Sequence, residues 1–408
     1  MVRSKHLFPK PLLILVFLIL ISPSSIFFLT YRKFWSNPLP QGSTVSLVES
    51  SPEDHLKKEN SPTSESVDYQ LIQVANNLYV PWSLVFTDPE KLLVTERDGK
   101  IRQIIDNQLD PDPLIQLNEV VSEGETGLMG MDLHPDYQTN HYLYVCLTYA
   151  HDNTLFNKIE RLIDHKDYIS HDQIIFDRIP AANNHAGCRV KFGPDSKLYI
   201  TTGDALQRNL AQDLNSLAGK ILRLNDDGSI PVDNPFPSSP VYSYGHRNPQ
   251  GLAWHPQGQL FATEHGPSGF DGPSGGDELN LISSGQNYGW PLVSHDKTHP
   301  DTISPLLVFT PAEAPSGALI YTGSLFPQFK NNLFFTALRG SGIFHVILND
   351  QDPTTILSYQ KLEINLGRIR DITQSPDGFI YFSTSNRDGR GQTKDGDDKI
   401  YRLEPITE

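Results

Sequence analysis

The chain contains 408 residues, of which 38% are hydrophobic, and it has 29 glycines, 31 prolines and a formal net charge of -15 at pH 7. A chain of this length can bury one large core or two ordinary ones. The acidic balance excludes a nucleic-acid-binding function, because phosphate binding requires a basic face.

Residues 1–33 are predicted to be an export segment. The apolar stretch 11–31 has basic residues on both sides, namely Arg3, Lys5 and Lys10 before it and Arg32 and Lys33 after it. It is either a cleaved signal peptide, with Leu12 to Ile21 as its apolar core, or an uncleaved membrane anchor. We favour the anchor, because basic residues close both ends and no A-x-A cleavage site is evident. Both alternatives place the body outside the cytoplasm, in the periplasm or at the cell surface.

Residues 34–68 differ from the rest of the chain in composition. They are rich in Ser, Pro, Glu and Lys, as in "ESSPEDHLKKENSPTSES". Such a segment buries little apolar surface and is predicted to be a flexible linker. The body then comprises residues 69–408.

The body contains a weak internal repeat of an apolar run, a turn with Pro, Asp or Gly, and an alternating run that ends in polar residues. The copies are "SLVFTDPEKLLVTERDGKI", "GMDLHPDYQTNHYLYVCLTY", "RVKFGPDSKLYITTGD", "GLAWHPQGQLFATEHG", "DITQSPDGFIYFSTSNRDG" and a looser "ALIYTGSLFPQFKNNLFFTALRG". These turns predict hairpins, because their residues adopt turn dihedrals at little steric cost. Six copies spaced by roughly 45 to 65 residues predict an all-β fold, a six-bladed β-propeller. The alternative, a pair of β-sandwiches, would not explain the repetition.

Cys146 and Cys188 are the only cysteines, so no disulfide framework is expected. Two alternatives are open for them, a single disulfide or two buried free thiols on neighbouring strands. In both cases stability comes mostly from burial of the core.

Polar residues flank the predicted strand pairs at equivalent places, and a propeller gathers the ends of its inner strands around one axis. The sequence therefore predicts that these residues meet at a central mouth. Arginines recur among them, and guanidinium groups suit a small, highly anionic ligand. The set comprises Glu125, Asn184, His185, Arg189, Arg247, Asn248, Glu264 to Pro267, Arg339, Arg368 and Arg370.

Several segments resemble the soluble glucose and aldose sugar dehydrogenases that use pyrroloquinoline quinone (PQQ). They are "NNHAGCRVKFGPDSKLYITTGD", "LAGKILRLNDDGSIPVDNPF", "YGHRNPQGLAWHPQGQLFATEHGP", "GGDELNLISSGQNYGWP" and "GRIRDITQSPDGFIYFSTS". The resemblance covers the chain from Val80 to Leu403 and is most specific from Asn183 to Pro291. The fold of that family, a six-bladed propeller, agrees with the fold predicted from the repeats.

The resemblance implies oxidation of aldose sugars at the anomeric carbon to lactones, by hydride transfer to calcium-bound PQQ. His185 would be the general base that takes the proton of the anomeric hydroxyl, and imidazole suits this task because its unperturbed pKa is near 6.5. Arg247 and Asn248 match the family pair that contacts the quinone. Arginine there would stabilise negative charge during hydride transfer.

Five further positions match cofactor or base neighbours of the family. Arg339, Arg368 and Arg370 fall where basic residues surround the carboxylates of the cofactor. Glu125 occupies the place of a glutamine near cofactor and substrate, where a carboxylate costs binding unless it is protonated or paired. Asn184 replaces an aspartate, so His185 is expected to lack the help of that carboxylate.

Two calcium positions are also implied by the resemblance. The backbone carbonyls of Gly266 and Pro267 match those that hold an ion beside the cofactor, and calcium prefers oxygen ligands. Glu278 and Tyr288 match a second position, with Asp277 as a neighbour. The acidic loop 388–399 is predicted to form hairpin turns rather than a calcium site.

Two other classes of function are weighed against the dehydrogenase. One is an exported propeller that binds a partner without quinone chemistry, which the linker and Glu125 favour. The other is a calcium-dependent, lactonase-like hydrolase, which needs central carboxylates where this sequence has mainly arginines. For the dehydrogenase, the expected partners are an aldose, the membrane through the N-terminal segment, and a membrane quinone or small redox protein as electron acceptor. A homodimer is left open.

Overall fold

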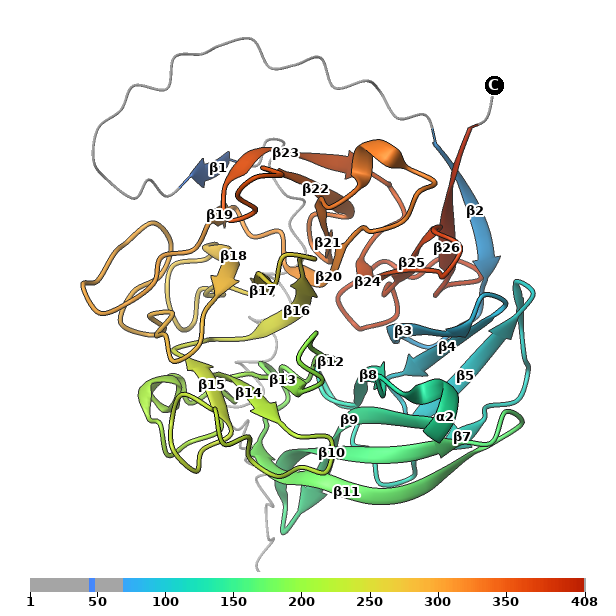
Figure 1. The fold of residues 1–408 in the computed structure, drawn as a ribbon, viewed down its shortest axis with the longest axis horizontal. Helices are drawn as coiled ribbons and strands as arrows, with labels where there is room; N and C mark the ends of the chain where they lie inside the picture. The colour runs from blue at the N-terminus through green and yellow to red at the C-terminus, as the bar shows by residue number, and fades with distance from the viewer. Residues whose placement is uncertain (1–43, 48–68, 407–408) are drawn as a thin grey trace, which may run out of the picture. The chain divides into compact units, whose positions relative to one another are not determined.

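The structure is a computed structural model that describes residues 44–47 and 69–406. Its strands form six antiparallel sheets arranged in a ring, so the predicted six-bladed β-propeller is confirmed (Figure 1). The predicted export segment 1–33 lies outside the described residues, as does all of the predicted linker except 44–47. Within the described part of the chain, no helix is long and apolar enough to cross a membrane.

In each blade the first strand lies nearest the axis and later strands pair outward. Blade 1 consists of β3 (Pro81–Asp88), β4 (Lys91–Glu96), β5 (Lys100–Ile105), β6 (Gln108–Leu109) and β7 (Ile115–Gln116), which also pairs with β5. Blade 2 consists of β8 (Leu128–Leu133), β9 (Tyr142–His151), β10 (Thr154–Asp164) and β11 (Ile169–Pro180). Blade 3 consists of β12 (Val190–Phe192), β13 (Leu198–Thr202), β14 (Lys220–Leu224) and β15 (Val241–Tyr244).

The last blade closes the ring, because its C-terminal strands pair with an N-terminal strand. Blade 4 consists of β16 (Pro249–Trp254), β17 (Leu260–Glu264), β18 (Asp277–Ile282), β19 (Leu307–Thr310) and β1 (Thr44–Leu47), which lies within the predicted linker. Blade 5 consists of β20 (Pro315–Ile320), β21 (Leu333–Ala337), β22 (Gly342–Leu348) and β23 (Ile356–Glu363). Blade 6 consists of β24 (Ile369–Gln374), β25 (Ile380–Thr384), β26 (Ile400–Pro405) and β2 (Tyr69–Ala75). The short helices are α2 (Tyr137–Asn140), η1 (Arg208–Gln212) and η2 (Pro327–Phe329).

The repeated turns join the first and second strands of the blades. In blades 3, 4 and 6 the last turn residue has a positive φ, at Ser196 (56°), Gly258 (98°) and Gly378 (95°). The second strands β13, β17, β21 and β25 are buried at every position. The expected alternation is therefore wrong for these strands, because a blade packed between two neighbours has no face toward solvent.

Cys146 and Cys188 form a disulfide. It joins β9 of blade 2 to the loop before β12 of blade 3, across a sequence separation of 42 residues. Closing a loop of this length removes about 4 kcal/mol of chain entropy from the unfolded state in the entropic model. Cys188 also follows His185 by three residues, so the bond restrains the loop that holds the candidate base.

Reduction of this disulfide is expected to lower the free energy of unfolding by about 2–5 kcal/mol. The measurement is urea unfolding with and without reductant. A Cys146→Ser/Cys188→Ser variant is the control, and its unfolding midpoint should not respond to reductant. A wild-type midpoint that reductant leaves unchanged would contradict the stabilising role.

Burial lowers the pKa of His345 to about 4. The ring lies on β22, stacks on Phe334 at 4.5 Å, and accepts a hydrogen bond at Nε2 from Nδ2 of Asn332 at 3.1 Å. The unfolded chain binds a proton on this residue below about pH 6.5, whereas the folded chain does so only below about pH 4. The free energy of unfolding should therefore fall as pH drops through this window, by about 3 kcal/mol at most from this group. Urea unfolding between pH 7 and 4 should show a smaller loss in His345→Gln, and equal losses in variant and wild type would refute the assignment.

Candidate active site

The loops that lead into the inner strands meet at one end of the propeller. In three blades a β-bulge interrupts strand pairing at the start of the inner strand, at Trp82, Gln250 and Arg370. A bulge re-aims the side chain of its extra residue. These three residues line one hollow together with Glu125 and His265. The fold thus brings predicted residues from blades far apart in sequence to one place.

His185 lies in the loop between β11 and β12, with a left-handed φ of 55°. Its Nδ1 is 2.7 Å from Oδ1 of Asp204, and its Nε2 is 2.7 Å from Nη2 of Arg247. A guanidinium only donates hydrogen bonds, so Nε2 must be the acceptor and Nδ1 must carry the proton that is donated to Asp204. His185 is therefore a neutral base with its lone pair on Nε2. Residue 184 supplies no carboxylate to His185, as expected, but Asp204 is a carboxylate neighbour that was not predicted from the sequence.

Asp204 follows β13 and receives donors on both carboxylate oxygens. Oδ1 accepts the backbone N–H of Leu206 at 2.9 Å besides His185, and Oδ2 accepts Nε1 of Trp290 at 2.8 Å. The preceding Gly203 permits this approach, because a Cβ there would lie 1.8 Å from the carbonyl oxygen of His185. The carboxylate is thus fixed relative to the imidazole.

Arg247 lies between β15 and β16 and is 2% exposed. Its Nε donates to Oδ2 of Asp271 at 2.7 Å, and Nη2 also donates to Oγ of Ser268 at 3.1 Å. Nη1 donates to the carbonyl oxygen of His265 at 3.1 Å. The guanidinium is therefore held by the loop after β17, so that it would remain in place if Nη2 released the imidazole.

Asn248 connects three loops of the site. Its Oδ1 accepts the backbone N–H of Gly187 at 3.0 Å and Nε2 of Gln250 at 3.1 Å, and its Nδ2 donates to Oε2 of Glu125 at 3.3 Å. Glu264 at the end of β17 accepts the backbone N–H groups of Arg247 and Asn248. The main chain of the Arg-Asn pair is thus pinned by a buried carboxylate.

Glu125 is paired with Arg390, a residue of the acidic loop. Its Oε1 lies 2.8 Å from Nη1 of Arg390, and its Oε2 accepts the backbone N–H of His185 at 2.8 Å. Burial is the largest single effect and raises the pKa of Glu125, but the charge and hydrogen bond of Arg390, together with the neighbouring His185 and His265, hold the pKa well below its usual range. The carboxylate is therefore ionised and paired with Arg390. Because the arginine compensates its charge, Glu125 need not repel an anionic ligand.

Two residues that line the hollow have buried nitrogen atoms without a hydrogen-bond partner, namely His265 at Nε2 and Arg370 at Nε. The Nε of buried Arg97, whose charge acts on Arg370, also lacks a partner. Burial lowers the pKa of Arg370 to about 9, so the guanidinium is still charged at neutral pH. Burial also lowers the pKa of His265 to about 3, so its ring is neutral there. Unpartnered buried donors are costly, and an anionic ligand with several acceptor oxygens would satisfy them.

Two further predicted arginines, Arg368 and Arg339, lie beside Leu338 of the hollow. Arg368 donates from Nε to Oδ2 of Asp388 at 2.7 Å and from Nη1 to the carbonyl oxygen of Leu338 at 3.2 Å. The backbone N–H of Arg339 donates to the carbonyl oxygen of Glu313 at 2.9 Å. Asp388 thus orients Arg368, and Arg368 lies next to Leu338, which lines the hollow.

The loop with the first predicted calcium position is organised by Asp277. Its Oδ1 accepts the backbone N–H of Gly266 at 2.7 Å, and its Oδ2 accepts those of Glu313 at 2.8 Å and Ala314 at 2.7 Å. The carbonyl oxygen of Pro267 accepts the N–H of Gly275 at 3.2 Å and keeps a second lone pair. Asp277 thus shapes the loop through backbone donors.

The second predicted calcium position contains closely placed oxygens. Glu278 lies opposite Glu264 in the sheet register, and burial together with the charge of Glu264 raises its pKa well above the ordinary value. Oδ1 of buried Asn280 lacks a hydrogen-bond partner. Tyr288 uses its hydroxyl otherwise, since it donates to the carbonyl oxygen of Leu281 at 2.7 Å. A cation would relieve the repulsion between Glu264 and Glu278 and satisfy Asn280.

A different group of potential metal ligands lies on blade 2, where Glu119, Glu160 and His171 come together. Lys158 lies 3.1 Å from Glu119 and 3.1 Å from Glu160. The lysine already neutralises part of the charge, so this group is an ion-pair network on the sheet.

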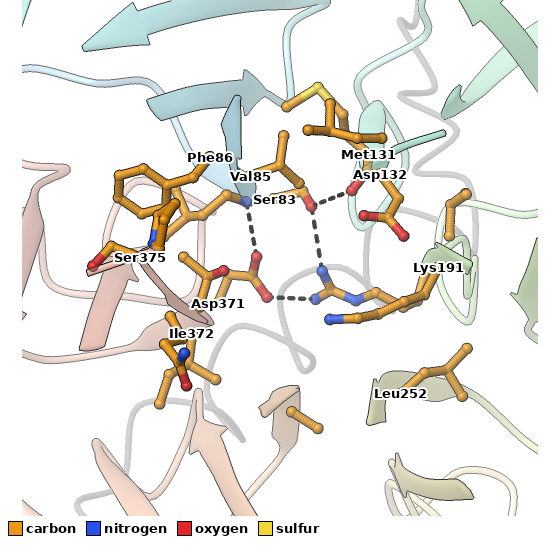
Figure 2. Close-up of a pocket in the computed structure, with 18 residues that line it drawn as sticks. Ser83, Val85, Phe86, Met131, Asp132, Lys191, Leu252, Asp371, Ile372 and Ser375 are labelled. Atoms are coloured by element: carbon orange, nitrogen blue, oxygen red, sulfur yellow. Dashed lines mark hydrogen bonds and ion pairs between the residues drawn. The ribbon is translucent and has the colours of Figure 1, made fainter. Parts of the chain in front are cut away.

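A cavity of about 300 Å³ lies toward the opposite ends of the inner strands (Figure 2). Arg189, predicted to lie at the mouth, instead pairs there with Asp371, at 3.0 Å from Nη2 to Oδ1. Its guanidinium stacks over Trp82 at 4.2 Å, and Oδ2 of Asp371 accepts the N–H of Leu84 at 2.9 Å. Figure 2 shows the side chains of Asp371 and Ser83 pointing toward this group of interactions. Trp82 and Arg189 thus lie between the cavity and the hollow.

Two residues of the candidate site, Asp204 and Arg390, were not predicted from the sequence, and His265 was placed at the mouth without a role. Asp204 ends the quoted segment "KLYITTGD", and His265 lies within "EHGP". Their place in the repeat, directly after a second strand, was the signal available for both. Arg390 lies in a loop set aside as turns, and no pattern in the sequence links it to Glu125.

Comparisons with known proteins identify the family of this chain. The glucose/sorbosone dehydrogenase family model matches residues 78–401. Aldose sugar dehydrogenase YliI of Escherichia coli strain K12 is 31% identical over 349 residues, covering 79% of this chain and 91% of that protein. Quinoprotein glucose dehydrogenase B of Acinetobacter calcoaceticus is 28% identical over 429 residues, covering 82% and 88%. The solved PQQ-bound form of aldose sugar dehydrogenase from Streptomyces coelicolor has a TM-score of 0.72 and 34% identity, covering 90% of this chain and 99% of that one.

Proposed function

This chain belongs to the glucose/sorbosone dehydrogenase family, and from this premise we propose that it oxidises aldose sugars at the anomeric carbon with PQQ and calcium. As a member of a sugar dehydrogenase family it is an oxidoreductase. One observation supports the proposal most. A neutral histidine base, oriented by a carboxylate, adjoins a hollow in which a buried arginine nitrogen and a buried histidine nitrogen lack hydrogen-bond partners.

The residues of the hollow fit PQQ, a planar tricarboxylate. When bound, PQQ would accept the hydride from the anomeric carbon of the sugar. Arg370 and Arg368 would face its carboxylates, and the unpartnered Nε of Arg370 would gain an acceptor. Asn248 and Arg247 would contact it from the opposite loop, with Arg247 stabilising negative charge on its oxygens.

His185 would remove the proton of the anomeric hydroxyl at Nε2, the ring nitrogen that carries the lone pair. Arg247 now donates to this atom, so the substrate hydroxyl would take its place, while Asp271 and Ser268 keep the guanidinium nearby. Asp204 would hold the ring and stabilise the imidazolium that forms. Proton transfer would thus depend on the Asp204–His185 pair.

Calcium would bind the carbonyl oxygens of Gly266 and Pro267, next to the hollow. The loop conformation held by Asp277 supports this position. A second ion near Glu278 would lower the raised pKa of that carboxyl and bind Oδ1 of Asn280. Calcium suits both positions, because it prefers several oxygen ligands in flexible geometry.

Calorimetric titration of the purified protein with PQQ, with and without calcium, tests the proposal. We expect binding that requires calcium and weakens at least tenfold in Arg370→Ala. Arg387→Ala is the matched control, since it removes the same charge from an exposed side chain of blade 6. Calcium-dependent binding would then be followed by dye-linked oxidation of an aldose panel.

No binding at millimolar PQQ, where about 4 kcal/mol of binding free energy is detectable, would refute the proposal. The exported binding module would then be favoured. Hydrolysis of lactones with calcium, but without PQQ, would instead favour the hydrolase.

Export and membrane attachment through residues 11–31 belong to the same proposal. The disulfide supports export, because disulfides persist in oxidising compartments. An enzyme outside the cytoplasm would pass its electrons to a membrane quinone or a small redox protein. Fractionation that requires detergent to release the intact chain would support the anchor over a cleaved signal peptide.

A further inference from the structure

Arg390 crosses between three loops at the mouth of the hollow. It belongs to the loop after β25, and its backbone N–H donates to Oδ1 of Asp388 at 2.9 Å. Its Nη1 lies 2.8 Å from Oε1 of Glu125, and its Nη2 donates to Oδ1 of Asn184 at 2.5 Å. One guanidinium therefore joins blade 6 to the loops that precede β8 and β12.

The same Glu125 carboxylate also supports the base. Its Oε2 accepts the backbone N–H of His185 at 2.8 Å and Nδ2 of Asn248 at 3.3 Å. The two oxygens thus have separate tasks. One binds Arg390, and the other orders the loop that presents His185.

The effect of Glu125 on an anionic ligand depends on whether Arg390 compensates its charge. Glu125 and Arg390 both line the hollow with Arg370. An ionised Glu125 alone would repel a tricarboxylate, whereas Glu125 paired with Arg390 contributes no net charge. Glu125 can then keep accepting hydrogen bonds at Oε2, which order the His185 loop, without repelling the ligand.

We propose that Glu125 and Arg390 act as one neutral unit in which Arg390 is a positioning and specificity residue for the anionic cofactor. Arg390 cancels the charge of Glu125, so Glu125 can hold the His185 loop inside a pocket that selects anions. This inference rests on the proposed function, since it takes PQQ as the occupant of the hollow. It predicts that the effect of losing Arg390 depends on the charge of residue 125.

A double-mutant cycle on the full chain tests the unit, with the Kd of PQQ measured by calorimetry in saturating calcium. Arg390→Ala is expected to weaken binding about ten- to hundredfold, because it leaves Glu125 unpaired. Glu125→Gln keeps an acceptor oxygen for His185 and removes the charge, so it should bind PQQ at least as tightly as wild type. The double variant should return to within about threefold of wild type.

Arg387→Ala is the control for loss of one positive charge from the same loop, and it should change the Kd by less than about threefold. Urea unfolding of every variant separates a folding defect from a binding defect. Independent, multiplicative effects of the two substitutions on Kd would overturn the inference while leaving the proposed function intact. A wild-type protein that does not bind PQQ would overturn both.

Discussion

Replacing His185 by asparagine is expected to lower kcat for aldose oxidation by about 10²- to 10⁴-fold, the usual contribution of a general base. Asparagine suits the test, because the residue has a φ of 55° and asparagine tolerates this left-handed conformation better than alanine. The Kd of PQQ should change little, because the role proposed for the imidazole is proton transfer and not cofactor binding. Steady-state kinetics and calorimetry on the same preparation measure the two effects.

His151→Asn is the control for this variant. His151 lies at the end of β9 with its side chain 46% exposed. The His151→Asn variant should oxidise aldoses at the wild-type rate. A His185→Asn protein that binds PQQ and keeps kcat within tenfold of wild type would remove His185 from the role of base.

The repeat architecture was predictable from the sequence because hairpin turns are local. Pro376 and Gly378 determine the backbone of their own turn, and similar turns recur in other blades, so six strand pairs were visible without any tertiary information. The burial of the second strands could not be predicted from local sequence in the same way. A second strand such as β17 is buried on both faces only because blades 3 and 5 flank its own blade.

The candidate site was predictable only in part, for a related reason. His185 and Arg247 lie in segments whose resemblance to a known family is specific. Arg390 acts through Glu125, 265 residues away in the sequence, and only closure of the ring brings the two together. The prediction placed Arg189 at the mouth because the residue lies near the start of an inner strand. In the structure it pairs with Asp371 near the axis of the propeller instead.

Asp204→Asn is expected to lower kcat about as much as loss of the base, by about 10²- to 10⁴-fold, although the substituted residue does not touch the substrate. Its carboxylate receives only donors, from Nδ1 of His185, Nε1 of Trp290 and the N–H of Leu206. Asparagine has a single acceptor oxygen, so its amide nitrogen must face one of these donors.

The amide nitrogen of Asn at position 204 can face His185 only if the ring proton moves to Nε2. That nitrogen then meets the donors of Arg247 and has no lone pair for the substrate proton. If the amide nitrogen faces Trp290 instead, the buried indole N–H loses its acceptor, which costs about 1–3 kcal/mol of stability. In the orientation toward His185 the backbone N–H of Leu206 loses its acceptor as well, so both orientations cost stability and kinetics distinguishes them. Asp213→Asn is the control at an exposed carboxylate. A variant with wild-type kcat and wild-type stability would show that the imidazole keeps its tautomer without Asp204, and the carboxylate would then have no part in orienting the base.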